Sequence, residues 1–111
     1  MTKREQIESK VRKAVANYFR ENVISTRVPF HIIQDQETVG HIINIGTSIM
    51  MNRLGIDTYP GSFVKAILDN DLHGAFSRAD RINSQVLGFY ITMMYNLGID
   101  ITNKEIEELK V

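Results

Sequence analysis

The sequence contains no cysteine and no tryptophan, and it has only two prolines. Without cysteine the chain can form no disulfide, thiolate metal site or cysteine nucleophile. It also has no run of about 18 apolar residues, the length that a membrane-spanning helix requires. Its charged start, MTKREQIESKVRK, lacks the apolar core of a secretion signal. We therefore expect a cytoplasmic protein that does not enter a membrane.

The motifs of common catalytic and cofactor chemistry are missing too. No G-x-x-x-x-G-K-[ST] or G-x-G-x-x-G loop is present to hold phosphates, and no G-x-S-x-G turn presents a nucleophilic serine. His31, His41 and His73 lie far apart, and no H-E-x-x-H pair occurs. We therefore predict that the chain is not an enzyme and uses no metal or cofactor.

The composition is that of a folded protein. Of 111 residues, 43% are hydrophobic and 23% are charged, which is the balance of a globular domain. A chain of this length is too short for two ordinary domains, and one core of this size gives modest stability. We therefore predict a single domain over residues 1–111.

Charge is unevenly distributed although the formal net charge is zero. Residues 1–27 contain seven basic and three acidic side chains, a balance of +4, so the rest of the chain balances to −4. The basic residues are Lys3, Arg4, Lys10, Arg12, Lys13, Arg20 and Arg27. This segment is suited to meet phosphates or an acidic subunit, although a solvated helix face gives the same pattern. The neutral total argues against nucleic acid as a partner.

The start of the chain has the pattern of a capped amphipathic helix. Thr2 and Glu5 match a capping box, and apolar residues then recur every three or four positions, which predicts a helix over residues 3–21. Residues 22–34 are rich in β-branched side chains and contain Pro29. They predict an extended connector or a short edge strand.

A second helix follows this connector. Asp35 is placed to cap its start, and Gly55 to end it, with Ile56 supplying the apolar contact that accompanies such caps. Gly40 and Gly46 within it predict a close neighbour.

The second half of the chain predicts a short helix and a long helix. A turn at residues 58–62 leads into the short helix, with Pro60 in its first turn and three apolar residues facing inward, Phe63, Ala66 and Ile67. Asn70-Asp71 interrupts it, and Asp71 is placed to cap the next helix. Apolar residues then recur at helical spacing over residues 72–97, which predicts one helix of about 26 residues and about 39 Å.

One pattern recurs at two helix ends. Residues 50–57 and 93–100 both contain Met-Met, then Leu-Gly-Ile-Asp, which we interpret as two copies of one helix stop. Residues 102–109 predict a short capped helix.

These elements predict an all-α fold. Residues 1–58 hold the N-terminal helices and connector, residues 59–98 form a short-plus-long helical hairpin core, and residues 99–111 hold the tail helix. The apolar stripe of the long helix is too broad for short neighbours to cover. We therefore expect a homo-oligomer, with function at subunit junctions.

Two polar residues interrupt the apolar row of the predicted long helix. Asp80 and Asn83 stand in one row with His73, Phe76, Leu87, Tyr90 and Met94. An unsatisfied polar group there costs about 1–3 kcal/mol, so each needs a hydrogen-bonding partner. Two interpretations remain open: a hydrogen bond between helices or subunits that fixes their register, or the floor of a polar pocket.

The pocket interpretation defines a candidate anion site. The two polar residues would read a base or sugar edge, and two neighbouring arginines would hold a phosphate through their planar guanidinium groups. A tyrosine at the preceding turn would stack on a base, and a lysine would add charge, unless the tyrosine packs on the long helix and the lysine is solvated. The candidate ligand-binding residues are Arg78, Asn83, Asp80, Arg81, Tyr59 and Lys65.

A series of short motifs between Tyr59 and Leu97 carries a family resemblance. They are Gly61-Ser62-Phe63, Ala66-Ile67-Leu68, Asn70-Asp71-Leu72, Ala75, Arg78-Ala79-Asp80, Asn83 and Tyr95-Asn96. In these motifs the chain resembles a group of small proteins encoded by bacteriophages and prophages, in which a second glycine often stands where Ser62 is found. The resemblance implies a phage origin and a helical hairpin, but no activity.

In size and expected architecture the chain is also similar to small helical phage sponges that sequester cyclic nucleotide signals of bacterial immunity, although no residue motif is shared. The leading hypothesis is therefore a phage-derived, non-catalytic binding protein that sequesters a small anionic ligand such as a nucleotide immune signal. The alternatives are a protein interaction or assembly module, and a DNA-binding regulator.

Overall fold

The computed structural model describes residues 2–109, and every regular element in that range is a helix. The all-α prediction is confirmed. The helices are α1 Lys3–Asn22, α2 Phe30–Ile33, α3 Gln36–Arg53, α4 Ser62–Leu68, α5 Leu72–Arg78, α6 Arg81–Gln85, α7 Leu87–Asn96 and α8 Asn103–Glu108. No helix within residues 2–109 has the length and hydrophobicity needed to cross a membrane.

Helix α1 forms as predicted, and it continues to Asn22. The hydroxyl of Thr2 accepts a hydrogen bond from the backbone N–H of Glu5 at 3.1 Å, and the Glu5 carboxylate accepts one from the backbone N–H of Thr2 at 3.2 Å. This capping box satisfies two N–H groups that have no partner inside the helix. The buried face consists of Ile7, Val11, Val15 and Phe19.

The segment after α1 is not extended, so the prediction for residues 22–34 is wrong. The chain turns immediately, with Val28 N–H bonded to Val23 C=O at 2.9 Å, and Pro29 then precedes the single turn of α2. A proline φ of −59° suits a helix start, where its missing N–H costs nothing. The β-branched Val28 and Ile32 are buried in the core instead of forming a strand.

Helix α3 begins at its predicted cap, since the Asp35 side chain accepts the backbone N–H of Glu37. The close neighbour predicted at Gly46 is present, because a Cβ there would lie 2.8 Å from Val15 Cγ1. The same prediction is wrong for Gly40, where a Cβ would meet nothing within 4 Å.

The end of α3 is a glycine-dependent stop. Gly55 has φ +78° and donates to Asn52 C=O, while Ile56 donates to Met51 C=O, both at 3.0 Å. This is the Schellman arrangement that the sequence predicts. The repeated pattern at residues 93–100 does not share it, because α7 ends through an extended Leu97 and Gly98 has no positive φ.

Helices α4 and α5 form a short hairpin. Phe63, Ala66 and Ile67 are buried as predicted, and Asp71 caps α5 by accepting the N–H of Gly74 at 2.8 Å. Pro60 is outside the first turn of α4, since Gly61 is the cap residue.

The long helix predicted over residues 72–97 is wrong, because the chain forms α5, α6 and α7 in its place. Ala79 is extended, and the carboxylate of Asp80 accepts the N–H of Asn83 at 2.7 Å, which starts α6. A short aspartate side chain competes for backbone N–H groups in this way and favours a helix start over a helix interior. A second break falls at Val86, with φ −117°.

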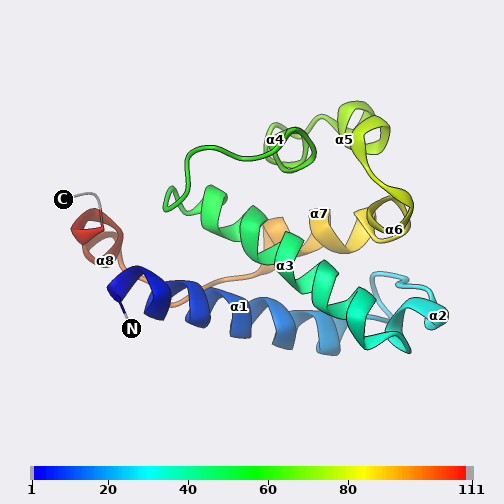
Figure 1. Ribbon diagram of the computed structural model, residues 1–111, viewed down its shortest axis with the longest axis horizontal. Coiled ribbons are helices and arrows are strands. Elements are labelled where there is room, and N and C mark those ends of the chain that lie inside the picture. The colour runs from blue at the N-terminus through cyan, green and yellow to red at the C-terminus, as the bar shows by residue number, and fades with distance from the viewer. Residues whose placement is uncertain (1, 110–111) are drawn as a thin grey trace.

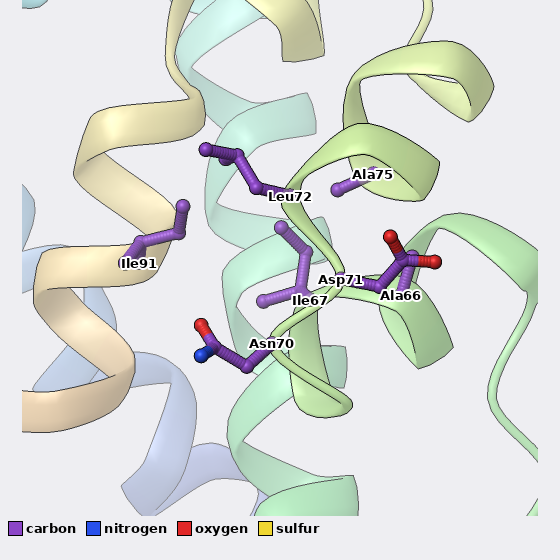
Figure 2. A pocket seen from close by; sticks show the side chains of 7 residues that line it. All are labelled: Ala66, Ile67, Asn70, Asp71, Leu72, Ala75 and Ile91. Atoms are coloured by element: carbon purple, nitrogen blue, oxygen red, sulfur yellow. The ribbon is translucent and has the colours of Figure 1, made fainter.

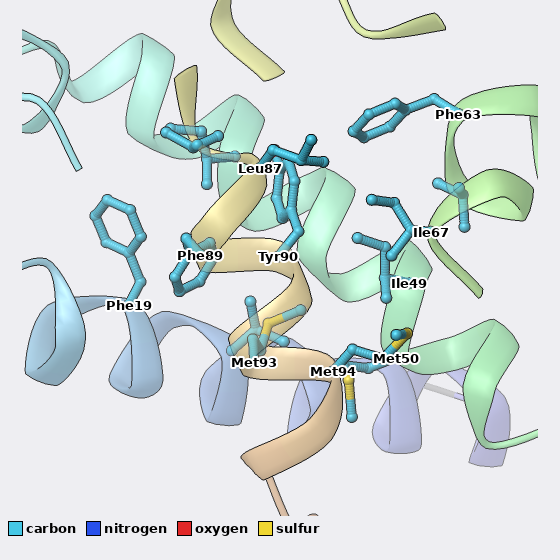
Figure 3. Packing of buried hydrophobic residues seen from close by; sticks show 14 of the residues in the cluster. Phe19, Ile49, Met50, Phe63, Ile67, Leu87, Phe89, Tyr90, Met93 and Met94 are labelled. Carbon is cyan, nitrogen blue, oxygen red and sulfur yellow. The ribbon is translucent and has the colours of Figure 1, made fainter. Parts of the chain in front are cut away.

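Helices α1, α3 and α7 pack together, and the α4–α5 hairpin covers another side of α3 (Figure 1). Helix α7 supplies the centre of the core, with Phe89, Tyr90, Met93 and Met94 buried against the other two helices (Figure 3). The rings of Phe19 and Phe89 meet edge to face at 5.1 Å. The Met-rich helix ends are therefore core.

Helix α8 returns to the beginning of α1 (Figure 1). It is the predicted tail helix, with a capping box formed by Thr102 and Glu105. Ile106 is buried, and Lys3 forms an ion pair with Glu108.

Candidate functional site

Two of the six predicted site residues line one cleft. Lys65 on α4 and Arg78 at the end of α5 face it, together with Ser62, Asp69 and Asp71. The Lys65 Nζ lies 2.6 Å from Asp69 Oδ2, and an Arg78 N–H donates to Gly74 C=O at 3.3 Å. The two cations therefore face two carboxylates, so the formal charge of the cleft is zero.

The other predicted residues lie apart from this cleft. Asn83 is buried, and its Oδ1 accepts the hydroxyl of Tyr90 at 2.7 Å. Asp80 caps α6, and its Oδ2 lies 3.6 Å from Nε2 of His41 on α3. Arg81 is exposed on α6, beyond the residues that line the cleft.

Tyr59 is also separate. It lies in the loop between α3 and α4 with 96% of its surface exposed. It packs against no helix, and the cleft lining does not include it.

A second small hollow lies between the α4–α5 turn and α7 (Figure 2). Leu72 from α5 and Ile91 from α7 lie on its two sides. Its volume of about 10 Å³ is room for one water molecule, so it holds no ligand. Beside it, Leu72 and Phe76 are 59% and 64% exposed on one side of α5.

The basic N-terminal segment divides into two halves. In the first half of α1, three cations form ion pairs: Lys3 with Glu108, Arg4 with Glu8 and Asp57, and Lys10 with Asp100. These pairs tie α1 to α8 and to the loops around it. The first half of the segment therefore uses its charge within the molecule.

The three later cations of α1 are arranged differently. Within residues 2–109, Arg12, Lys13 and Arg20 form no ion pair, and all three are exposed. Together with Asn17 they line a shallow depression that also contains Ile43 of α3. Arg12 also borders a hollow with Glu5 and Glu8. Lys13 and Arg20, by contrast, border no hollow of the described chain that is lined by a carboxylate.

This depression continues into an apolar hollow. The second hollow is lined by Arg20 and Ile43 again, and also by Phe19, Ile33, Gln36 and Val39. Because Arg20 and Ile43 line both, we treat them as one surface, the basic groove, defined by Arg12, Lys13, Ala16, Asn17, Phe19, Arg20, Ile33, Gln36, Val39 and Ile43. Its cations come from α1, and its apolar floor comes from α2 and α3.

One feature of the sequence pointed to the basic groove, namely the excess positive charge of residues 1–27. No feature pointed to the apolar floor, because Val39 and Ile43 follow the same helical spacing as core residues. Only the packing of α1 beside α3 leaves these two side chains partly exposed.

The chemistry available to the groove is binding by charge and apolar contact. Three cations, two amides and apolar side chains line it, without a carboxylate or histidine to move a proton. Elsewhere in residues 2–109, no three His, Asp or Glu side chains gather where they could hold a metal ion. The phage resemblance stays a prediction. No protein-family model, no curated protein and no solved structure matches the chain.

Proposed function

We propose that the chain is a non-catalytic binding protein that recognises an anionic partner at the basic groove. The observation that carries this proposal is the free charge of Lys13 and Arg20, beside other α1 cations that are paired within the molecule. A carboxylate or phosphate brought to these side chains gains attraction without displacing an internal carboxylate, because the internal partner of Arg20 is the neutral amide oxygen of Asn17.

The groove supports anion binding better than the α4–α5 cleft. A ligand in the cleft would have to compete with Asp69 for Lys65, and would meet the carboxylate of Asp71. The side-chain oxygen of Asn83 already accepts a hydrogen bond from the Tyr90 hydroxyl, so that bond would have to break before this oxygen could bind a ligand. A nucleotide signal, the ligand expected from the sequence, remains one form of the anionic partner.

The test compares two neutralised variants that remove the same charge. Lys13→Gln/Arg20→Gln removes two cations from the groove, and Lys65→Gln/Arg78→Gln removes two from the cleft. The probes are linear and cyclic nucleotides, scored by native mass spectrometry, and a fluorescent glutamate-rich peptide, scored by anisotropy. We expect binding of at least one probe to weaken about tenfold in the groove variant and to remain unchanged in the cleft variant.

Salt dependence provides a second readout. Binding through exposed charges weakens as the screening length falls from about 10 Å at 0.1 M salt to about 3 Å at 1 M. If no probe binds at low salt, the proposal is wrong. Binding that survives in the groove variant and disappears in the cleft variant would place the site at Lys65 and Arg78.

A second candidate is an assembly module. The specific observation in its favour is the exposed pair Leu72 and Phe76 on α5, of which Leu72 borders one hollow together with Ile91 of α7. Sedimentation velocity of the wild type and of Phe76→Glu tests self-association through this surface. A wild-type oligomer that becomes a monomer on substitution supports the candidate, and a monomeric wild type removes it.

A further inference from the structure

We propose that the partner at the basic groove is an acidic amphipathic α-helix of another protein. This inference rests on the proposed function and names its partner. It follows from the way in which charge and apolar surface are arranged along the groove.

The groove has the two parts that a helix partner requires. Lys13 and Arg20 provide charge on α1, and Val39 and Ile43 provide an aliphatic strip on the neighbouring α3. A helix with an apolar stripe and adjacent acids contacts both parts at once. A purely polar anion uses only the first part and leaves the aliphatic strip in water.

The position of the groove within the bundle also suits a helix. Gly46 lies against Val15 of α1 and Met93 of α7, so α7 packs where these helices meet in the core. The groove is formed by other side chains of α1 and α3, which are partly or fully exposed except for the buried Phe19. A partner helix there would pack on both helices as a fourth member of the bundle.

The spacing of the cations matches a helix. Lys13 and Arg20 are seven residues apart on α1, which places them about 10 Å apart along the helix axis and on similar sides. Two acids seven residues apart on a partner helix have the same separation. The phosphates of one nucleotide span a shorter distance than this separation. They would therefore bind fully to only one of the two cations.

The groove lacks the usual means of holding a base or phosphate. The one aromatic ring in its lining, Phe19, is only 2% exposed and offers no stacking face. The start of α3 is adjacent at Gln36, but the Asp35 carboxylate already accepts the backbone N–H of Glu37 there, and the Glu37 side chain adds further negative charge. A helical polypeptide is therefore the partner that fits best.

Gly40 provides a way to block the groove without disturbing the fold. It lies on α3 between Gln36 and Ile43, and a Cβ there meets nothing within 4 Å. Gly40→Leu therefore adds bulk at the lip of the groove, and leucine also favours the helix more than glycine does. Asn44→Leu is the matched control, since Asn44 is exposed on α3 and is not among the groove residues.

The experiment measures binding of a designed peptide of about 20 residues, long enough for about 30 Å of helix. It repeats Glu and Leu so that both fall on one helical side, and a scrambled peptide has the same composition without that side. We expect the patterned peptide to bind about tenfold more tightly than the scrambled one and to gain helical circular dichroism on binding. Gly40→Leu and Lys13→Gln/Arg20→Gln should each weaken it, and Asn44→Leu should not.

The outcomes separate this inference from the proposed function. Equal binding of both peptides, or binding of nucleotides alone, overturns the helix partner and leaves an anion-binding protein. Absence of binding by every peptide and nucleotide overturns both. If the patterned peptide binds and Gly40→Leu has no effect, the helix does not lie in the groove, and the inference is wrong.

Discussion

The hydroxyl of Tyr90 donates a 2.7 Å hydrogen bond to Oδ1 of Asn83, and both side chains are buried. This bond joins α6 to α7 across the break at Val86. The sequence requires a partner for Asn83, and the structure identifies Tyr90 as that partner. Because the Asp80 carboxylate accepts the N–H of Asn83, the three residues form one polar connection beside the core.

Removing the Tyr90 hydroxyl should destabilise the protein. Tyr90→Phe keeps the ring but leaves Asn83 Oδ1 buried without a donor, which costs about 1–3 kcal/mol. Tyr18→Phe is the control, because its ring also lies against Phe89 and its hydroxyl forms no hydrogen bond within the described chain. Urea denaturation of the two variants measures the difference. Equal free energies of unfolding would show that the Tyr90 bond contributes nothing.

The same hydroxyl should make the fold sensitive to alkali. Burial, and to a smaller extent the nearby Asp80 carboxylate, raises the pKa of Tyr90 well above its ordinary value. The unfolded chain therefore loses this proton first, near pH 10, while the folded chain keeps it. The stability from this residue is full below about pH 10 and falls above it, by at most about 1.4 kcal/mol per pH unit.

Denaturation between pH 9 and 11 tests this dependence, with Tyr90→Phe as the reference that lacks the titrating group. The wild type should lose stability more steeply than the variant over that range. Parallel curves would show that Tyr90 ionises as readily in the folded chain as in the unfolded one.

Two glycines of α3 should respond in opposite directions to alanine. Gly46→Ala places a Cβ 2.8 Å from Val15 Cγ1, so it overpacks the contact between α1 and α3 and costs about 1–3 kcal/mol. Gly40→Ala meets no atom within 4 Å and should stabilise the helix by up to about 1 kcal/mol. Thermal denaturation should therefore place the two midpoints on either side of the wild type. If Gly46→Ala were as stable as the wild type, α1 would be able to shift away from the added methyl group with little loss of folding free energy.

The repeated helix ends provide a second matched pair. Gly55 adopts φ +78°, which costs other residues about 1–2 kcal/mol, so Gly55→Ala should be destabilising. Gly98 has the same sequence neighbours but no positive φ and no atom near its added Cβ, so Gly98→Ala should be close to neutral. If the two variants lost the same free energy of unfolding in chemical denaturation, the interpretation of two identical helix stops would be correct after all.

Local sequence signals placed four helix starts correctly. The caps at Thr2, Asp35, Asp71 and Thr102 use short oxygen-bearing side chains that bond N–H groups two or three residues ahead. These contacts are contained in a few consecutive residues, so the sequence determines them. The positive φ of Gly55 is local in the same sense.

Asp80 shows where the same reasoning failed. Its cap is as local as the others, but the apolar spacing over residues 72–97 continues through the break and hides it. A periodic pattern records which residues are buried, and three short helices can bury the same residues as one long helix. The choice between these two arrangements depends on tertiary packing, in which α5 lies against α4 while α7 lies against α1 and α3.

The predicted site had a similar limit. The sequence indicated cations and polar residues as candidates, but it did not show which charges would be neutralised inside the molecule. Lys65 is paired with Asp69, and Arg4 with Asp57 more than fifty positions away. Lys13 and Arg20 remain free because no acid is brought to them.

By itself, the sequence determined the all-α class, the principal caps and the excess of positive charge near the N-terminus, because each depends on residue type and on neighbours within one or two helical turns. Only the tertiary structure decided that α1 lies beside α3 with a basic and apolar groove along them. Charge pairing and side-chain exposure depend on which distant residues meet, and that is settled when the helices pack.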